Sequence, residues 1–255
     1  MDLHANIEGE GEPLFILHGF LGMGDNWKSL SKLYAENGFQ VHLIDQRNHG
    51  RSPHSSKFNY DCLASDVIGY AHQKKIEKFS IIGHSMGGKT AMTVACEQPE
   101  LIKKLIVADI APKYYAPHHQ TILNGLTHLH EATIASRKEA DEILASYIKS
   151  KGVRMFLLKN LYRKDKHTYG LRVNLTSLKA NIEEVGKALP EKLQFAGSTL
   201  FLKGANSNYI LDEDQKQIFH HFPKAKIETI LNAGHWLHAE NKDAFFSASI
   251  SFLSD

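Results

Sequence analysis

Residues 79–88, Phe-Ser-Ile-Ile-Gly-His-Ser-Met-Gly-Gly, place the pattern G-x-S-x-G between a short apolar run and a helical stretch. Gly83 and Gly87 permit a tight strand-to-helix turn in which a serine is held in a strained backbone conformation. The N-terminus of the following helix would direct backbone N–H groups and a positive dipole to the same point. The stretch therefore predicts that the Ser85 hydroxyl stands exposed at the carboxyl end of a central strand.

Short apolar runs alternate with helical patterns on both sides of this stretch. Buried strands are expected at residues 13–20, 41–45, 79–83, 105–109, 198–204 and 226–231. Helices are expected at residues 25–38, 61–75, 87–98, 212–221 and 243–253. Apolar strands that alternate with helices indicate a parallel sheet covered on both faces. The predicted fold class is therefore α/β, with a mostly parallel central sheet flanked by helices.

The segment between residues 109 and 198 interrupts this alternation. It is several times longer than the roughly dozen residues that a parallel crossover needs. Its helix-like stretches lie at residues 118–130, 137–149 and 153–163, and no buried strand is evident among them. We expect residues 112–190 to form a helical cap inserted into a core made of residues 1–111 and 191–255.

Length and composition narrow the class of protein. The 255 residues are 42% hydrophobic and 23% charged, which is typical of a globular chain. The net charge of +2 is too small for a nucleic-acid-binding protein. No apolar run approaches the roughly 18 residues of a membrane helix, and no signal-like N-terminus is visible. The two cysteines, Cys62 and Cys96, do not suggest a disulfide framework, so we expect a cytoplasmic protein. From the small net charge and the lack of a long apolar run, we expect it to bind neither nucleic acid nor a membrane.

A serine hydroxyl needs a general base to act as a nucleophile. Of the 16 histidines, His235 is the best placed, because it follows the last predicted strand and would lie at the same edge of the sheet as Ser85. A carboxylate must orient this imidazole. Asp109, which ends the strand beyond that of Ser85, is the favoured candidate, and Asp212 is the alternative. The remaining histidines lack metal-ligand spacing, so neither a metal nor a cofactor is expected.

Acyl transfer also requires donors for the developing oxyanion. The backbone N–H groups of Phe20, in the glycine-rich loop 18–22, and of Met86, directly after Ser85, are the candidates. Four further side chains are candidates for contacting the substrate: Leu21, Arg154, Phe156 and Trp236. Arg154 belongs to a basic part of the predicted cap that would meet a phosphate-bearing leaving group such as coenzyme A.

Four motifs, taken together and in this order, resemble the α/β-hydrolase superfamily over essentially the whole chain. They are His-Gly-Phe-Leu-Gly at 18–22, Asp-Gln-Arg-Asn-His-Gly-Arg-Ser at 45–52, Gly-His-Ser-Met-Gly-Gly at 83–88 and Ala-Gly-His at 233–235. The Arg-Asn-His-Gly form of the second motif is similar to that of YbfF-type bacterial esterases. The resemblance implies hydrolysis of acyl esters, or of thioesters such as acyl-CoA, with Ser85 as nucleophile, His235 as base and Asp109 as acid. Ser207 occupies the position of the acid that is common in other hydrolases.

Other functions are compatible with the same residues. A carbon–carbon bond hydrolase or a cofactor-free haloperoxidase would use the same triad, and a ligand receptor would keep the scaffold without turnover. Turnover of a p-nitrophenyl ester would distinguish an enzyme from a receptor. We expect a serine esterase or thioesterase that forms an acyl-Ser85 intermediate with a small-molecule substrate.

Overall fold

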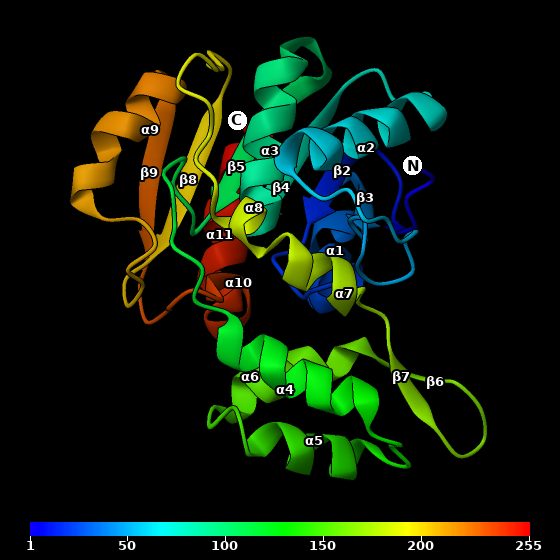
Figure 1. Cartoon of the computed structure of the whole chain (residues 1–255). Coiled ribbons are helices and arrows are strands. Elements are labelled where there is room, and N and C mark those ends of the chain that lie inside the picture. Colours follow the sequence, from blue (N-terminus) through cyan, green and yellow to red (C-terminus); the bar gives the residue numbers. More distant parts are fainter.

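The computed structural model describes residues 1–255 and is built around a seven-stranded sheet (Figure 1). The strand order is β1-β3-β2-β4-β5-β8-β9, and every neighbouring pair is parallel except β1 and β3. The strands are β1 (Ala5–Glu8), β2 (Glu12–Leu17), β3 (Phe39–Ile44), β4 (Phe79–His84), β5 (Ile102–Ala108), β8 (Thr199–Gly204) and β9 (Ala225–Ile230). This architecture confirms the predicted α/β class.

Helices cover both faces of the sheet because alternate residues of each strand point to opposite sides. Phe15 and Leu17 of β2 pack toward one face, and Leu14 and Ile16 pack toward the other. The first face is covered by α2 (Tyr60–Gln73), α3 (Met86–Glu97) and α9 (Gln215–His221). The second is covered by α1 (Lys28–Glu36) and α11 (Lys242–Ser254), with the short α10 (Leu237–Glu240) beside them. Single 3₁₀ turns are η1 (Gly24–Trp27), η2 (Pro99–Leu101) and η4 (Asp212–Asp214).

The two edges of the sheet differ from the sequence-based expectation. The four-residue β1 was not predicted, since Ala-Asn-Ile-Glu is short, half polar and paired on one side only. The last strand was expected to be buried, but β9 is an edge strand in which most side chains are partly or fully exposed. None of the helices combines the length and the apolar character needed to cross a bilayer.

A mostly helical insertion follows β5 and ends before β8, and its distal part lies below the core in Figure 1. Its elements are α4 (Gln120–Glu131), α5 (Arg137–Ala145), α6 (Lys151–Leu157), η3 (Leu158–Asn160), β6 (Leu161–Arg163), β7 (Tyr169–Leu171), α7 (Leu175–Ala180) and α8 (Ile182–Gly186). Leucines of these helices share one apolar cluster with Phe20, Leu21 and Met86 of the core. The insertion is therefore packed onto the edge of the sheet where β2 and β4 end.

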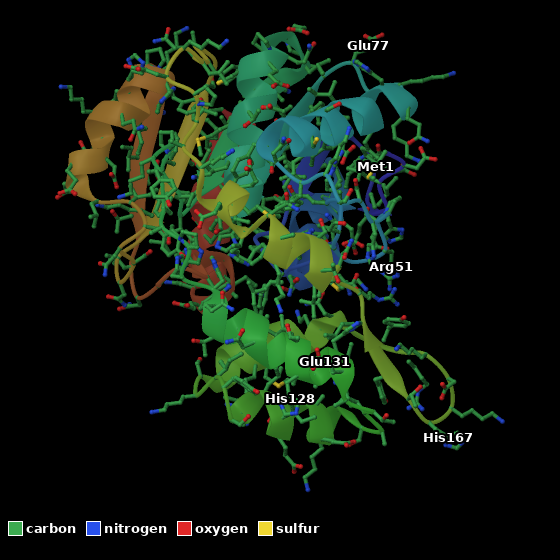
Figure 2. The ribbon with its side chains drawn as sticks, viewed as in Figure 1. Met1, Arg51, Glu77, His128, Glu131 and His167 are labelled. Carbon is green, nitrogen blue, oxygen red and sulfur yellow. The ribbon has the colours of Figure 1, made fainter.

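The hairpin formed by β6 and β7 corrects two expectations, a helix that runs to residue 163 and an insertion without strands. The helical run ends because the side-chain amide of Asn160 donates hydrogen bonds to the carbonyls of Leu157 (3.2 Å) and Leu21 (2.8 Å). The chain then turns back so that Leu161 pairs with Leu171. His167, at the tip of this hairpin, points away from the molecule in Figure 2.

One buried lysine joins the two ends of the insertion to α3. The Lys89 ammonium donates hydrogen bonds to the carbonyls of Lys113 (2.8 Å) and Gly186 (2.9 Å), and a third to that of Lys187. The ring of Tyr115 lies 4.9 Å from the same ammonium. Because α3 begins directly after Ser85, Lys89 anchors the base of the insertion to the helix that carries the predicted nucleophile.

Candidate active site

Three parallel strands bring Ser85, Asp109 and His235 together at one edge of the sheet. Ser85 follows β4, Asp109 follows β5, and His235 lies in the loop after β9. The Nε2 atom of His235 is 3.1 Å from Ser85 Oγ, and its Nδ1 atom is 2.8 Å from Asp109 Oδ2. Since a carboxylate can only accept a hydrogen bond, Nδ1 carries the proton and Nε2 is free to accept one from the serine hydroxyl.

The serine is held in the strained turn that the sequence predicted. Its backbone has φ 53° and ψ −118°, and its N–H donates to the carbonyl of Ala108 at 3.0 Å. A Cβ atom on Gly83 would lie 2.2 Å from the carbonyl oxygen of Gly87, and one on Gly87 would lie 2.4 Å from that of Leu17. Gly83 is therefore required for the turn to close on itself, and Gly87 for the turn to fit against the end of β2.

Asp109, rather than Asp212, lies beside His235. The Asp109 side chain is fully buried and also accepts hydrogen bonds from the Gly204 N–H (2.9 Å) and the Ser207 hydroxyl. The side chain of Asp212 is 87% exposed and pairs with Lys203 at 3.0 Å. Of the two carboxylates that the sequence left open, Asp109 is the one within hydrogen-bond distance of His235.

The two oxyanion candidates lie on either side of Ser85. Met86 is the first residue of α3, so its N–H has no acceptor within the helix. No hydrogen bond within the protein uses the N–H of Phe20, whereas the N–H of Leu21 donates to His49 Nε2 at 3.1 Å. The geometry therefore leaves Phe20 and Met86, and not Leu21, as available backbone donors.

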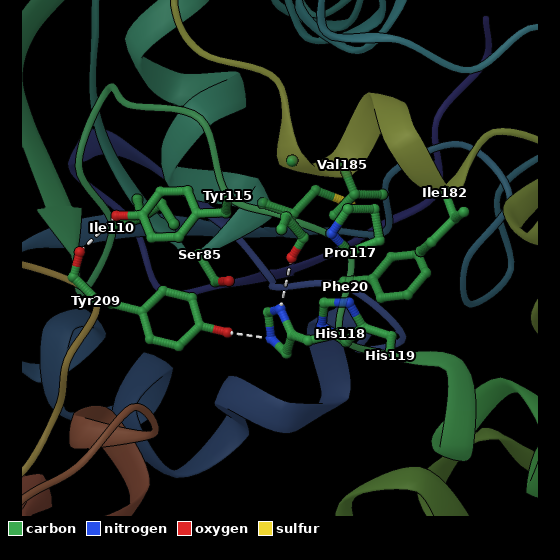
Figure 3. Close-up of a pocket in the computed structure, with 13 residues that line it drawn as sticks. Phe20, Ser85, Ile110, Tyr115, Pro117, His118, His119, Ile182, Val185 and Tyr209 are labelled. Carbon is green, nitrogen blue, oxygen red and sulfur yellow. Dashed lines mark hydrogen bonds between the residues drawn. The ribbon is translucent and has the colours of Figure 1, made fainter.

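Ser85 opens into a cavity with two lobes. The smaller lobe, about 20 Å³, appears in Figure 3, where the serine hydroxyl lies between the rings of Tyr115 and Tyr209 on one side and Phe20 on the other. The larger lobe, about 140 Å³, includes His235. Five residues line both lobes: Phe20, Ser85, His118, His119 and Tyr209.

The predicted substrate-contacting residues do not all reach this cavity. Leu21, Phe156 and Trp236 line the larger lobe. The guanidinium of Arg154 instead pairs with Asp141 of α5 (2.7 Å) and donates to carbonyls of the turn between α5 and α6, which places it outside the lining of both lobes. Its charge is therefore used to join α5 to α6.

Several lining residues were not identified from the sequence. Tyr209 stacks on the His235 ring at a centroid distance of 3.7 Å, and its hydroxyl bonds to His118 Nε2 at 2.7 Å. His118 and His119 were expected within a helix, but α4 begins after them and both side chains line the cavity. Tyr209 lies two residues after Ser207, whereas the two histidines gave no signal beyond their adjacency.

An outer cavity of about 420 Å³ adjoins the larger lobe, with which it shares Val153, Phe156 and Trp236. Arg137 and Lys159 also line it, and neither forms a salt bridge. The outer cavity thus presents two free cations next to the larger lobe. No cluster of three or more His, Cys, Asp or Glu side chains is placed to hold a metal ion.

Four buried histidine rings surround the three central residues. Burial lowers the pKa of His18 to about 4, lowers those of His49 and His238 to about 3, and holds that of His84 well below its usual range. Two of them accept backbone hydrogen bonds: Nε2 of His18 from the Gln46 N–H (3.0 Å), and Nε2 of His49 from the Leu21 N–H. These rings are therefore neutral supports for the loops that line the site.

Known proteins resemble this chain along nearly all of its length. Residues 12–141 match the sequence model of the family described as "alpha/beta hydrolase fold". The sn-1-specific diacylglycerol lipase ABHD11 of Danio rerio is 39% identical, over 96% of this chain and 80% of the relative. Esterase YbfF of Escherichia coli (strain K12) is 30% identical, over 98% of this chain and 96% of the relative. A solved structure, "Marine microorganism esterase", is 42% identical with a TM-score of 0.93, and each chain is covered to 99%.

The buried histidines predict an acid-sensitive fold. Their folded-state pKa values lie below the unfolded value of 6.5, so protonation favours the unfolded chain. Their contribution to stability is complete above pH 6.5 and is lost as the pH falls toward 4, by about 1.4 kcal/mol per pH unit for each ring. Urea unfolding should show nearly constant stability between pH 8 and 7 and a loss of several kcal/mol between pH 6.5 and 5. Equal stability at pH 6.5 and 5 would contradict this account.

Proposed function

We propose that this chain, which belongs to the α/β-hydrolase family and is a hydrolase of the esterase and lipase class, cleaves esters and thioesters through an acyl-Ser85 intermediate. The observation that carries the proposal is the continuous hydrogen-bonded line from Asp109 through His235 to Ser85, at 2.8 and 3.1 Å. Relatives named as esterases and lipases favour this reaction over carbon–carbon bond hydrolysis, halogenation or ligand reception.

In the proposed reaction, His235 Nε2 accepts the hydroxyl proton as Ser85 Oγ attacks the acyl carbon. The negative charge that develops on the carbonyl oxygen is stabilised by the N–H groups of Phe20 and Met86. His235 then returns the proton to the leaving oxygen or sulfur, and the bond to the acyl carbon breaks. Water, deprotonated by His235, attacks the acyl-Ser85 carbon. The bond from this carbon to Oγ then breaks, His235 returns the proton to Oγ, and the carboxylic acid leaves. Asp109 holds the ring and stabilises its cationic form throughout.

The two lobes suggest where each part of the substrate lies. The leaving atom must receive its proton from His235, and this residue lines the larger lobe but not the smaller one. We therefore place the leaving group in the larger lobe and the acyl group in the smaller lobe, against Met86, Ile182 and Val185. A volume of about 20 Å³ admits little more than one or two water-sized groups beyond the carbonyl carbon.

Two classes of leaving group suit the larger lobe. Thioesters such as acyl-CoA are supported by the outer cavity, where the free cations of Arg137 and Lys159 would meet phosphate groups beyond the larger lobe. Neutral glycerol esters are supported by the relatives named as sn-1-specific diacylglycerol lipases. Arg154 is paired with Asp141 and is not proposed to contact either class of leaving group.

Replacement of the nucleophile tests the proposal directly. Ser85→Ala should lower kcat for p-nitrophenyl acetate by about 10⁴-fold or more, because the attacking oxygen is lost. A fluorophosphonate probe should label the native protein at Ser85, as peptide mass spectrometry would show. Labelling at another residue, or an active Ser85→Ala protein, would remove the basis of the assignment.

The choice of carboxylate is tested by a matched pair of substitutions. Asp109→Asn should lower kcat by about 10⁴-fold, because an amide no longer fixes the His235 tautomer or stabilises its cation. Asp212→Asn removes the same charge at an exposed position and should leave kcat within about twofold. If Asp212→Asn is instead the damaging change, the acid has been assigned wrongly.

The assignment of the lobes predicts a preference for short acyl chains. Among p-nitrophenyl esters, the acetate and propionate should have kcat/KM values at least about tenfold above the octanoate, because each unaccommodated methylene costs about 1–3 kcal/mol. Val185→Ala enlarges the smaller lobe and should move the optimum to longer chains. Val153→Ala, which enlarges the larger lobe, should leave the optimum in place. A shift with Val153→Ala alone would reverse the assignment.

A further inference from the structure

His119 lies where the insertion meets the reacting groups. It directly precedes α4 and lines both lobes of the cavity together with Ser85. Its ring packs edge-on against Phe20 at a centroid distance of 5.0 Å and lies 4.1 Å from the ring of His118. Figure 3 shows it beside these two side chains. The proposed reaction leaves this histidine without a role.

The hydrogen bonds of the two adjacent histidines differ sharply. Both ring nitrogens of His118 are used, Nδ1 with the carbonyl of Ala116 (3.1 Å) and Nε2 with the hydroxyl of Tyr209 (2.7 Å). No hydrogen bond within the protein involves either nitrogen of His119, and its Nδ1 atom is buried. Nδ1 has no accessible surface, so Nε2, which also lacks a protein partner, is the ring nitrogen that a substrate group in the cavity can reach.

The charge of His119 restricts the chemistry of that partner. Burial, together with the neighbouring His118 and His235, lowers the pKa of His119 to about 4. The ring is therefore neutral near pH 7, with one nitrogen that donates and one that accepts. Such a ring suits an uncharged group that can do both, a hydroxyl or an amide, and offers no ion pair to a carboxylate or phosphate.

We propose that His119 is a specificity-determining residue that hydrogen-bonds an uncharged hydroxyl or amide in the leaving part of the substrate, a few atoms from the scissile bond. The inference rests on the proposed function, because it assumes that the leaving group occupies the larger lobe, which His119 and His235 both line. A hydroxyl is available at this distance in an ester of glycerol. An amide is available in a thioester of a pantetheine-like thiol.

Two pairs of substrates, each differing only in the polar group, distinguish these sources. Glycerol 1-monopropionate is compared with propyl propionate, and S-propionyl-N-acetylcysteamine with S-pentyl thiopropionate. In the unmodified protein, kcat/KM should be about tenfold higher for the polar member of at least one pair, which is the effect of one hydrogen bond. His119→Phe keeps a ring against Phe20 and should bring that ratio close to one. The pair that responds identifies the group recognised.

A matched control and a second readout keep the result interpretable. His130→Phe makes the same change at an exposed position of α4, outside the cavity, and should leave the ratios unchanged. Fluorophosphonate labelling of Ser85 reports the proposed function separately, so a protein that does not label fails that proposal and this inference with it. The inference is wrong if Ser85 is labelled but kcat/KM is equal within both substrate pairs. It is equally wrong if His119→Phe leaves the ratio of the responsive pair unchanged, because His119 then makes no hydrogen bond that selects the substrate. Should His119→Phe not fold, His119→Leu provides the same comparison.

Discussion

The close contact between the backbone of Gly87 and the carbonyl of Leu17 is the constraint on which the site depends. It lets the first turn of α3 lie directly against the end of β2, so that the Ser85 turn and the Phe20 loop meet at one point. A methyl group at this position would lie 2.4 Å from the Leu17 carbonyl oxygen, so the two segments would have to move apart. Ser85, the proposed nucleophile, and its two candidate oxyanion donors are therefore placed by backbone packing, before any side chain contributes.

Backbone strain is concentrated at the same edge of the sheet. Six non-glycine residues have positive φ, and five of them lie beyond the carboxyl end of a different parallel strand: Leu21, Asn48, Ser85, Asp109 and Asn232. Such conformations cost on the order of 1 kcal/mol or more each and persist only where the surrounding structure enforces them. The buried core of the sheet and the neutral histidines beneath these loops supply that enforcement.

Site residues at the carboxyl ends of strands could be predicted from the sequence. Residues whose positions depend on how the insertion packs could not. Ser85 and His235 follow predicted strands and Asp109 ends one, and parallel strands bring such positions together. Arg154 was expected to bind substrate because it lies in a basic part of the insertion. Its partner, Asp141, lies on another helix, so the pairing was not evident from the spacing of the two residues in the sequence. The β6–β7 hairpin was missed because its strands have three residues each, too few to show an alternation. His119 could be placed in the lining of the cavity only from the structure, in which α4 begins one residue after it.

The Lys89 contacts have a consequence for how such an enzyme tolerates change. One ammonium holds Lys113 and Gly186 together, so the chain between them is a closed loop whose two ends meet at a fixed point of the core. The entropy needed to close a loop grows only with the logarithm of its length, and doubling the length costs about 0.6 kcal/mol. Helices can therefore be added to or removed from this loop with little penalty to the sheet, provided that the new segment buries its own apolar surface. Lys89 thus fixes both ends of the insertion to α3, so that a change of length within the insertion need not displace the strands of the sheet.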